Sequence, residues 1–538
     1  MFDDDLPEPV VRVTGNACLV SIAMPAKGWT RPQSDADDLT SALAVNVPVG
    51  CGAGASTLTA LCRAVQADPD RAVREMSPPF TLLWEDRPTG TFRLQTDGLG
   101  LAPLYVFDDG DLWAASNRVM TLQAAGVQLH PQPVDWATRL TVGWFPLDRS
   151  GFRGVRAASP GWGASLDGVG VVTRTASPLD DWLHPPPEAV AVWCERVRQR
   201  MLDDIRCAAG GWSGTPQVSL TGGRDSRAIA SCLLALGIPF TAYVHGAASH
   251  PDVRVARLLA ETAGLPLKHD PAIGRPPDDV AAARRSIELA LRWQGGERGA
   301  HKHKLFLPGG RRLGAGRVEI SGQHGEIGRA KTKVHGLSVA PDDTLVAPYI
   351  AAIPDAVRSD LKDDVCDVIR EMCGQVDRFD LPPSRRRDFF SLFERSRRRS
   401  AAAHASKTGI VLSPFMSPDF IRAGFAVTPE LKRGDPFHRH LVDVNFPSWS
   451  AVPYEEELPP VAGAAEVGAA WEATIRSRSY DTVVWWDEVG LPILDDAFDS
   501  GGFWTQVLDA ERLTPGRVSV PDELAMLAML PSALGVPA

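Results

Sequence analysis

The spacing of apolar residues changes about a third of the way along the chain. In the first third, short runs such as residues 92–95 and 104–107 alternate apolar and polar side chains, and Gly and Asp turns separate them. Such alternation predicts the half-buried strands of antiparallel sheet, with a few helices between them. Further on, Trp193, Val197 and Met201 recur every four residues, which predicts an amphipathic helix.

A run of three prolines at residues 185–187 lies between these two patterns. Because proline lacks an N–H group and fixes φ, such a run can continue neither a helix nor a central strand. Residues 176–188 are therefore predicted to be a linker. We expect a first domain over residues 1–183 and a second over residues 188–538.

Predicted strands and helices alternate after the linker. Residues 217–220 form a predicted strand, followed by a loop at 221–227 and an apolar helical stretch at 228–236. A second predicted strand at 241–244 precedes a helical pattern at 253–263. This order is typical of a parallel α/β sheet. We therefore expect an α+β first domain and an α/β second domain with helical additions.

Composition and charge narrow the class of protein. The chain of 538 residues is 44% hydrophobic and 23% charged, as is ordinary for a globular protein, and its net charge of -10 argues against a nucleic-acid partner. No apolar run approaches the ~18 residues of a membrane helix, and the acidic first residues lack a signal-peptide layout. The eight cysteines form no C-x-x-C pair. A cytoplasmic protein without a membrane partner is expected.

The loop at residues 221–227 carries the clearest chemical signal. Two glycines between a strand and a helix let the backbone approach an anion, and the helix start directs N–H groups toward it. Hydroxyl donors surround the glycines at Ser219, Thr221 and Ser226. Asp225 would repel a phosphate unless a cation such as Mg²⁺ bridged the two. The loop predicts a Mg²⁺–nucleotide site; the alternative is a plain turn in which Ser226 caps the helix.

Two motifs resemble those of known nucleotide-binding ligases. The sequence SLTGGRDSR at 219–227 resembles the S-G-G-x-D-S pyrophosphate loop of ATP pyrophosphatases, with Thr221 in the first place. The sequence SGQHGEI at 321–327 is similar to the S-G-x-G-x-D-E element of asparagine and β-lactam synthetases, whose first acid binds Mg²⁺. Aligned without a gap, Glu326 takes the place of that acid, Ile327 replaces the second acid, and His324 stands at the second glycine. Alone, this second segment would be an ordinary turn with a surface glutamate.

Shorter segments extend the resemblance over roughly residues 75–430. Residues 97–105 are similar to the family's D-x-x-G-x-x-P-L-Y segment, and residues 152–163 to its F-x-G-I-x-x-L-x-P-G turn. Asp252, followed by Ala256, matches its D-x-x-x-A pattern. The chain thus resembles the asparagine synthetase-like amide ligases. That resemblance implies an Ntn-hydrolase-like αββα sandwich in the first domain and a PP-loop ATP-pyrophosphatase fold in the second.

The resemblance also implies an activity. Glutamine-dependent members carry a catalytic cysteine at position 2, where this chain has Phe2. A first domain without glutaminase activity is similar to that of β-lactam synthetases and lasso-peptide macrolactam cyclases, which adenylate a carboxylate and let the substrate's own amine displace AMP. We expect macrolactam formation in a peptide precursor, with a leader-peptide-binding protein and a leader protease as further partners. Closure or ligation of a small amino acid, and a non-catalytic nucleotide-binding protein, are the alternatives.

Residue roles follow from matching the motifs position by position. Phosphate binding falls to the glycine loop, namely Ser219, Leu220, Thr221, Gly222, Gly223 and Ser226. Mg²⁺ would be held by Asp225 and Glu326. Neutralisation of the leaving pyrophosphate falls to Arg224, Arg227 and Lys407. Adenosine would meet the backbone around Val244 and His245 and around Ser321 and Gly322.

Some patterns leave two interpretations open. Residues 50–55 fit a dinucleotide fingerprint or a glycine-rich turn, and residues 301–304 a metal site or a solvated loop. Residues 385–399 predict either a core helix with a solvated basic face or an electropositive wall for pyrophosphate or an acidic peptide. For a tyrosine–glutamate pair like that of β-lactam synthetases, Tyr349 and Tyr454, the latter beside Glu455, are the candidates.

Overall fold

The computed structural model describes most of the chain. The described residues are 8–14, 17–22, 27–30, 34–46, 48–49, 57–246, 248–270, 287–288, 291–292, 294–297, 318–329, 345–399, 409–458 and 502–509, with single residues at 512, 527, 530 and 534. Residues 50–55, residues 301–304 and Lys407 lie outside these ranges, and so does Phe2.

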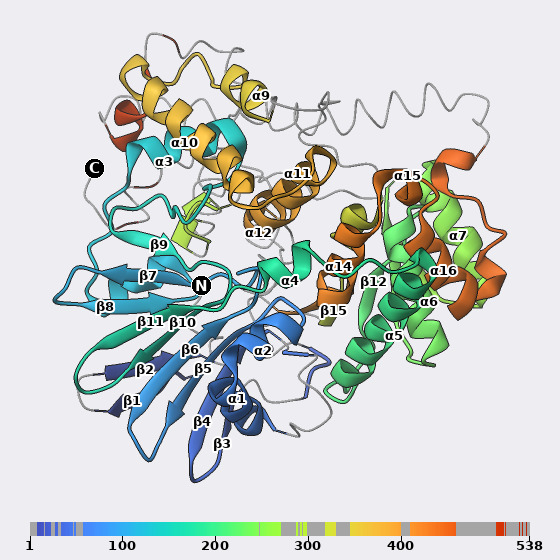
Figure 1. The fold of residues 1–538 in the computed structure, drawn as a ribbon, viewed down its shortest axis with the longest axis horizontal. Coiled ribbons are helices and arrows are strands. Elements are labelled where there is room, and N and C mark those ends of the chain that lie inside the picture. The colour runs from blue at the N-terminus through green and yellow to red at the C-terminus, as the bar shows by residue number, and fades with distance from the viewer. Residues whose placement is uncertain are drawn as a thin grey trace.

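The N-terminal part is built on antiparallel sheets (Figure 1). The largest has the strand order β11-β10-β6-β5-β4-β3, and a smaller one has the order β8-β7-β9. The strands of the larger sheet are β3 (Ser34–Ala36), β4 (Thr40–Val45), β5 (Thr81–Asp86), β6 (Thr91–Thr96), β10 (Trp162–Leu166) and β11 (Val171–Thr175). The other strands are β7 (Tyr105–Asp108), β8 (Trp113–Ser116) and β9 (Val155–Ala157), and the hairpin β1 (Val10–Thr14) and β2 (Ala17–Ser21). The alternating sequence pattern therefore predicted this sheet region.

The short helix α1 (Leu58–Ala67) packs on the larger sheet, and α2 (Pro69–Glu75) follows it and packs against α1. The side chain of Thr57 accepts a hydrogen bond from the N–H of Ala60 and starts α1. Asp68 ends α1 and caps α2, where Pro69 takes the first helical position. Leu61 and Val65 of α1 are buried with Leu82 and Trp84 of β5.

A five-stranded parallel sheet with the order β14-β13-β12-β15-β16 organises the C-terminal part. Its strands are β12 (Gln217–Ser219), β13 (Thr241–His245), β14 (Leu267–Asp270), β15 (Val318–Ile320) and β16 (Ile410–Leu412). The helices between the first strands are α6 (Arg224–Ala235) and α7 (Pro251–Ala263), and α5 (Val190–Ala209) precedes them. The predicted alternation of strand and helix is confirmed, and the molecule is a mixed α/β protein.

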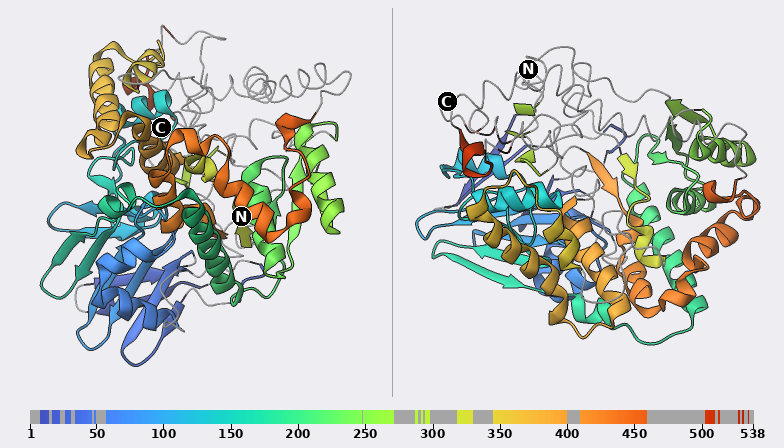
Figure 2. Two further views of the ribbon diagram at one scale, coloured as in Figure 1. Left: turned by 45° about the vertical axis from the view of Figure 1, so that its right-hand side comes forward. Right: turned by 90° about the horizontal axis from the view of Figure 1, so that it is seen from above.

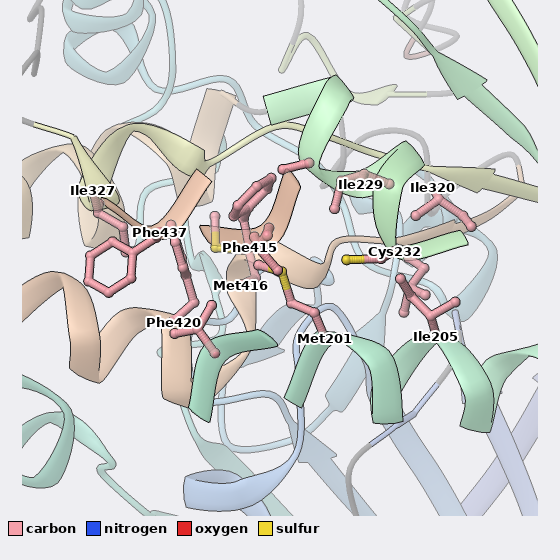
Figure 3. Close-up of a cluster of buried hydrophobic side chains, with 14 of the residues drawn as sticks. Met201, Ile205, Ile229, Cys232, Ile320, Ile327, Phe415, Met416, Phe420 and Phe437 are labelled. Atoms are coloured by element: carbon pink, nitrogen blue, oxygen red, sulfur yellow. The ribbon is translucent and has the colours of Figure 1, made fainter. Parts of the chain in front are cut away.

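The core of this part forms where the helices meet the sheet. Met201 and Ile205 of α5 lie against Ile229 and Cys232 of α6, beside Ile320 of β15 (Figure 3). All five are at most 1% exposed. The period of four that runs along α5 therefore marks its buried face.

Further helices complete the fold, which the two additional views show above and beside the sheets (Figure 2). The α-helices are α3 (Pro133–Val142), α4 (Leu179–Leu183), α9 (Val346–Ala351), α10 (Lys362–Gly374), α11 (Pro383–Phe389), α12 (Arg397–Arg399), α14 (Pro418–Ala426), α15 (Pro429–Lys432) and α16 (Pro436–Asn445). The 3₁₀ segments are η1 (Val119–Ala125), η4 (Gly325–Gly328), η5 (Ser359–Leu361), η6 (Gln375–Arg378), η8 (Pro414–Met416), η9 (Pro447–Trp449), η10 (Glu455–Glu457) and η12 (Phe503–Gln506), and η7 (Phe390–Ser396) is a π-helix. Among the described residues, no helix has the length and apolar character needed to cross a bilayer.

The proline run lies outside regular structure, as predicted, but the linker prediction for residues 176–188 is otherwise wrong, because α4 lies within this range and its Trp182 is fully buried. Buried polar bonds join the parts on either side of the prolines. The Ser77 hydroxyl donates to Asp204 of α5 over 2.5 Å, and Arg200 donates to both of them. The side-chain amide of Asn46 bonds the N–H and C=O of Val411 at 2.8 and 2.6 Å. The N-terminal sheet region is therefore fixed against the parallel sheet.

Residues 385–399 form a core-packed helical segment, as one interpretation predicted, but only part of their basic face is solvated. Phe389, Phe390 and Phe393 are buried, as a core helix requires. Arg397 and Arg398, however, are at most 9% exposed, and Arg398 donates to the backbone carbonyls of residues 145 and 149. Arg397 and Arg398 are therefore not solvated, and they form no electropositive wall. Their guanidinium groups instead join this segment to the loop after α3.

Candidate functional site

The glycine loop lies at the carboxyl end of β12, between that strand and α6. The N–H of Leu220 donates to the carbonyl of Tyr243, which extends the pairing of β12 with β13 by one residue. Gly223 then takes the N-cap position, and α6 begins at Arg224. The predicted order of strand, loop and helix is thus confirmed, and the loop sits where open α/β sheets bind ligands.

Hydrogen bonds within the loop hold its backbone in a tight turn. The N–H of Thr221 donates to the Ser226 hydroxyl at 3.1 Å, and the N–H of Gly223 donates to the Thr221 hydroxyl at 3.1 Å. Ser226 therefore reaches back from the first turn of α6, and the interpretation of Ser226 as the helix cap is wrong. The N–H of Gly222 points out of the loop and donates to Asp252 over 2.8 Å.

The second motif packs directly on the first. Strands β12 and β15 are neighbours, and the loops that follow them meet at the same sheet edge. A Cβ atom on Gly322 would lie 2.9 Å from the N atom of Ser226, and one on Gly325 would lie 2.0 Å from Oδ1 of Asp225. Only glycine fits at such distances, so the motif glycines permit the contact between the loops.

Asp225 is the charged centre of this contact. Its Oδ2 accepts a hydrogen bond from Arg329 over 2.8 Å, and its Oδ1 lies 2.8 Å from Nε2 of His438. Burial by itself raises the pKa of the Asp225 carboxyl, but the His438, Arg329 and Arg224 side chains outweigh burial and hold the pKa below its usual value. Asp225 is therefore an ionised carboxylate.

Two histidines behind the loop were not assigned from sequence. His438 of α16 is fully buried and stacks on Phe415 with ring centroids 5.1 Å apart. His324 is 5% exposed, and burial lowers its pKa to about 3, so its imidazole is neutral. Its φ of 79° lies in the left-handed region, which glycine adopts more easily than histidine.

Glu326 is exposed on η4, directly after the glycine that contacts Asp225, and Ile327 is buried. Hard carboxylate oxygens are the ligands that Mg²⁺ uses beside phosphate oxygens, so the donor chemistry of Asp225 and Glu326 fits the ion. Within the described ranges, no three His, Cys, Asp or Glu side chains gather as a protein-only metal site. The protein would thus supply one or two carboxylate ligands to Mg²⁺. In the structure, the groups beside Asp225 are Arg329 and His438.

Arg224 and Arg227 point toward a segment that follows η9. Arg224 forms ion pairs with Asp435 and, at 2.6 Å, with Glu456. Arg227 donates to the carbonyls of Val452 and Pro453 at 2.6 and 2.8 Å, and burial lowers its pKa to about 10. The two arginines therefore hold this segment, a role that their place in the loop motif did not predict.

The same segment reaches the glycine loop itself. The N–H of Glu455 donates to the carbonyl of Gly222 at 3.2 Å, and a Cβ on Gly222 would lie 2.8 Å from Cβ of Glu455. A hydrogen bond to Asp252, together with burial, raises the pKa of Glu455 to about 7. Tyr454 beside Glu455 was singled out from sequence, and it does lie at the loop. Tyr349 does not lie at the loop. It packs against Trp144 and Phe390 in a hydrophobic cluster that is separate from the core of the parallel sheet.

The residues expected near adenosine lie along the same sheet edge. Val244 is buried and His245 is exposed at the end of β13, where His245 lies 3.3 Å from Asp270. The N–H of Ser321 donates to the carbonyl of Leu412 at 2.8 Å, and its hydroxyl accepts from the N–H of Gln323 at 3.2 Å. Val244 and His245 therefore flank the loop pair, and Ser321 and Gly322 begin its second loop, at the carboxyl ends of the strands.

A scan against models of protein families finds no match to this chain, and a search of curated proteins finds no significant match either. What supports a function is therefore the geometry of the two loops and the motif pattern within them.

Proposed function

We propose that the chain is an ATP- and Mg²⁺-dependent, AMP-forming amide ligase of the asparagine synthetase-like kind. The observation that carries this proposal is the contact of the two motif loops, where Gly322 and Gly325 pack against Asp225 and Ser226. In this proposal, residues 1–183 form an Ntn-hydrolase-like sandwich without glutaminase activity. Residues 188–538 form the PP-loop ligase domain.

The reaction has two steps. A substrate carboxylate oxygen attacks the α-phosphorus of ATP and pyrophosphate leaves; an amine then attacks the acyl carbon of the adenylate, and AMP leaves as the amide forms. The amine gives up one proton in the second step. An α-amine, with a pKa of about 8, is partly neutral near pH 7 and so needs less help from a base than a lysine amine does.

The chain's own residues serve the first step. The first turn of α6 offers helix-terminal N–H groups to the β- and γ-phosphates, with the hydroxyls of Ser219, Thr221 and Ser226 beside them. Asp225 and Glu326 would hold Mg²⁺, which would neutralise phosphate charge. The backbone at Val244–His245 and Ser321–Gly322 borders the adenosine.

The substrate class follows from the same resemblance. The proposed substrate is a precursor peptide whose own carboxylate and amine are joined to close a macrolactam. A leader-peptide-binding protein and a leader protease are the proposed partners. A small amino acid is the alternative substrate. The seven cysteines in the described ranges are free thiols, which agrees with a reducing, cytoplasmic location.

One observation favours a different class. Both carboxylate oxygens of Asp225 already face nitrogen atoms, those of Arg329 and His438. A chain that binds nucleotide without catalysis would keep such a pre-neutralised carboxylate, since Asp225 would then have no need of a metal ion. Exchange activity separates the two classes.

The test is ATP–pyrophosphate exchange, run with a peptide fraction and separately with a small amino-acid fraction. Asp225→Asn, which keeps the shape of the side chain, should reduce exchange at least about tenfold. Asp367→Ala, which removes an exposed carboxylate of α10, should leave exchange unchanged. Nucleotide binding without exchange in the wild type, with either fraction, would contradict the ligase and favour the non-catalytic protein.

A further inference from the structure

The acidic segment, residues 452–457, lies across the glycine loop. It follows Trp449, which is fully buried and donates its indole N–H to the carbonyl of Leu259 over 2.9 Å. Beyond this anchor, the chain passes Arg227, which binds two of its carbonyls, and reaches Gly222 at Glu455. The segment thus contacts two places in the loop motif that we propose for phosphate binding.

Cations surround the aromatic ring of the segment. The guanidinium carbons of Arg224 and Arg227 lie 4.3 and 4.1 Å from the ring centroid of Tyr454, and that of Arg439 lies at 5.3 Å. Such contacts are attractive, because each cation faces the negative face of the ring. The ring therefore occupies a strongly positive part of the site.

Carboxylates of the segment use the same cations. Glu456 pairs with Arg224 at 2.6 Å and Glu457 lies 3.6 Å from Arg439. These two glutamates, one of them held by Arg224 at the start of α6, present the kind of charge that a polyphosphate would present there. The segment and a nucleotide would compete for one set of donors.

Glu455 and Asp252 add a carboxyl pair at the loop. Both side chains lie over Gly222: Oδ1 of Asp252 accepts its N–H at 2.8 Å, and a Cβ on Gly222 would lie 3.2 Å from that oxygen and 2.8 Å from Cβ of Glu455. Arg224 and Glu456 are the other charged groups near Glu455, and His250 lies 3.9 Å from Asp252. A protonated Glu455 can lie beside Asp252 over Gly222, whereas loss of its proton would set two negative charges against each other.

We propose that residues 452–457 are an internal competitor of the nucleotide: the segment leaves the glycine loop, and Glu455 loses its proton, when the polyphosphate of ATP binds. The proposal rests on the proposed function. It adds a regulation to the same site, in which nucleotide affinity increases as the pH rises.

The size of the effect follows from the change in pKa. The covered state holds a proton with a pKa of about 7, whereas an exposed glutamate has a pKa of about 4.3. Uncovering therefore releases about 0.9 proton at pH 6 and about 0.1 at pH 8, and affinity should increase about tenfold between these pH values.

Isothermal titration calorimetry with the Mg²⁺ complex of a β,γ-imido analogue of ATP tests this inference in the full chain. Titrations in buffers of different ionisation enthalpy give the number of protons released at pH 6, 7 and 8. Glu455→Gln, which keeps a hydrogen bond to Asp252 but cannot lose the proton, should abolish the chain's share of that release and flatten the pH dependence. The analogue's own phosphate titration is common to both proteins and cancels in their difference.

A second variant tests competition without titration. Glu456→Gln removes the ion pair with Arg224 and should raise affinity about two- to fivefold, as expected for a half-exposed pair. Glu371→Gln, which removes an exposed carboxylate of α10, is the matched control and should change nothing. Equal affinities and equal proton release in all four proteins would overturn the competitor while leaving the nucleotide site in place. Absence of binding in every protein would overturn the proposed function as well.

Discussion

At the scale of single residues, Asp225 joins three elements that lie far apart in the sequence. It stands in the first turn of α6, accepts a hydrogen bond from Arg329 after η4, and touches His438 of α16. The side chain of Asp225 is only 22% exposed, and these partners favour its ionised form because a poorly solvated charge is costly without them. The contacts of Asp225 are therefore expected to stabilise the fold as well as to form part of the candidate site.

Replacement of Arg329 by glutamine should lower stability at neutral pH by about 1.5–3 kcal/mol, the range for a hydrogen bond to a charged group. Because the pKa of Asp225 is held below its usual value in the folded chain, its stabilising effect is present above pH 4 and is lost as the pH falls. Thermal melts from pH 7 to pH 3.5 should show the difference between wild type and Arg329→Gln shrinking with acid. A difference that stays constant would mean that Arg329 acts through packing alone.

The sequence allowed a sound prediction of the loop but not of its partners. The strand, glycines and helix of residues 217–235 follow from local periodicity and from the φ freedom of glycine. Nothing local marks Arg329 or His438 as partners of Asp225, because no spacing pattern connects residues so far apart. Glu455 was noted only as the neighbour of Tyr454. Its position beside Asp252 depends on the tertiary fold, which brings residues 452–457 back to the glycine loop.

At the scale of elements, neighbouring strands decide which loops meet. β12 and β15 pair in parallel, and the loops after them share one edge of the sheet. The π-helix η7 also brings distant segments together. Its Glu394 accepts hydrogen bonds from the indole N–H of Trp144 and from the backbone N–H of Leu147. The arginines after it were misjudged from sequence because a run of arginines usually faces solvent, and only the tertiary fold supplies carbonyls to bury them against.

Gly325→Ala should separate the two loops. The added Cβ would lie 2.0 Å from Oδ1 of Asp225, and overpacking of this kind costs about 1–3 kcal/mol. We expect ATP–pyrophosphate exchange to fall about 10- to 100-fold while circular dichroism stays unchanged. Gly374→Ala is the matched control, since its Cβ would meet only Oδ2 of Asp377 at 3.8 Å. Undiminished exchange in Gly325→Ala would show that the contact does not serve catalysis.

At the scale of the whole molecule, the N-terminal part covers an edge of the parallel sheet. β16 is the last strand of that sheet, and its free side bonds the side chain of Asn46. An uncovered edge is prone to pairing with other chains, so the two parts protect each other. Sequence patterns defined each part but gave no sign of this contact at the sheet edge, where the side-chain amide of Asn46 bonds β16.

Asn46→Gly should weaken that junction without straining the backbone, because Asn46 has a φ of 67° that glycine adopts freely. The buried N–H and C=O of Val411 would lose their partner, at a cost of about 1–3 kcal/mol. Urea unfolding followed by tryptophan fluorescence measures the change. Unaltered unfolding in this variant would mean that water replaces the amide at the edge.

The distance along the chain between Asn46 and Val411 has a consequence for biosynthesis. The two residues are 365 positions apart. At about 5–20 residues per second, a ribosome needs roughly 20–70 s to reach the second after making the first. Throughout that interval the nascent N-terminal sheet lacks the strand it will cover, so newly made chains should depend on holding chaperones more than completed ones do.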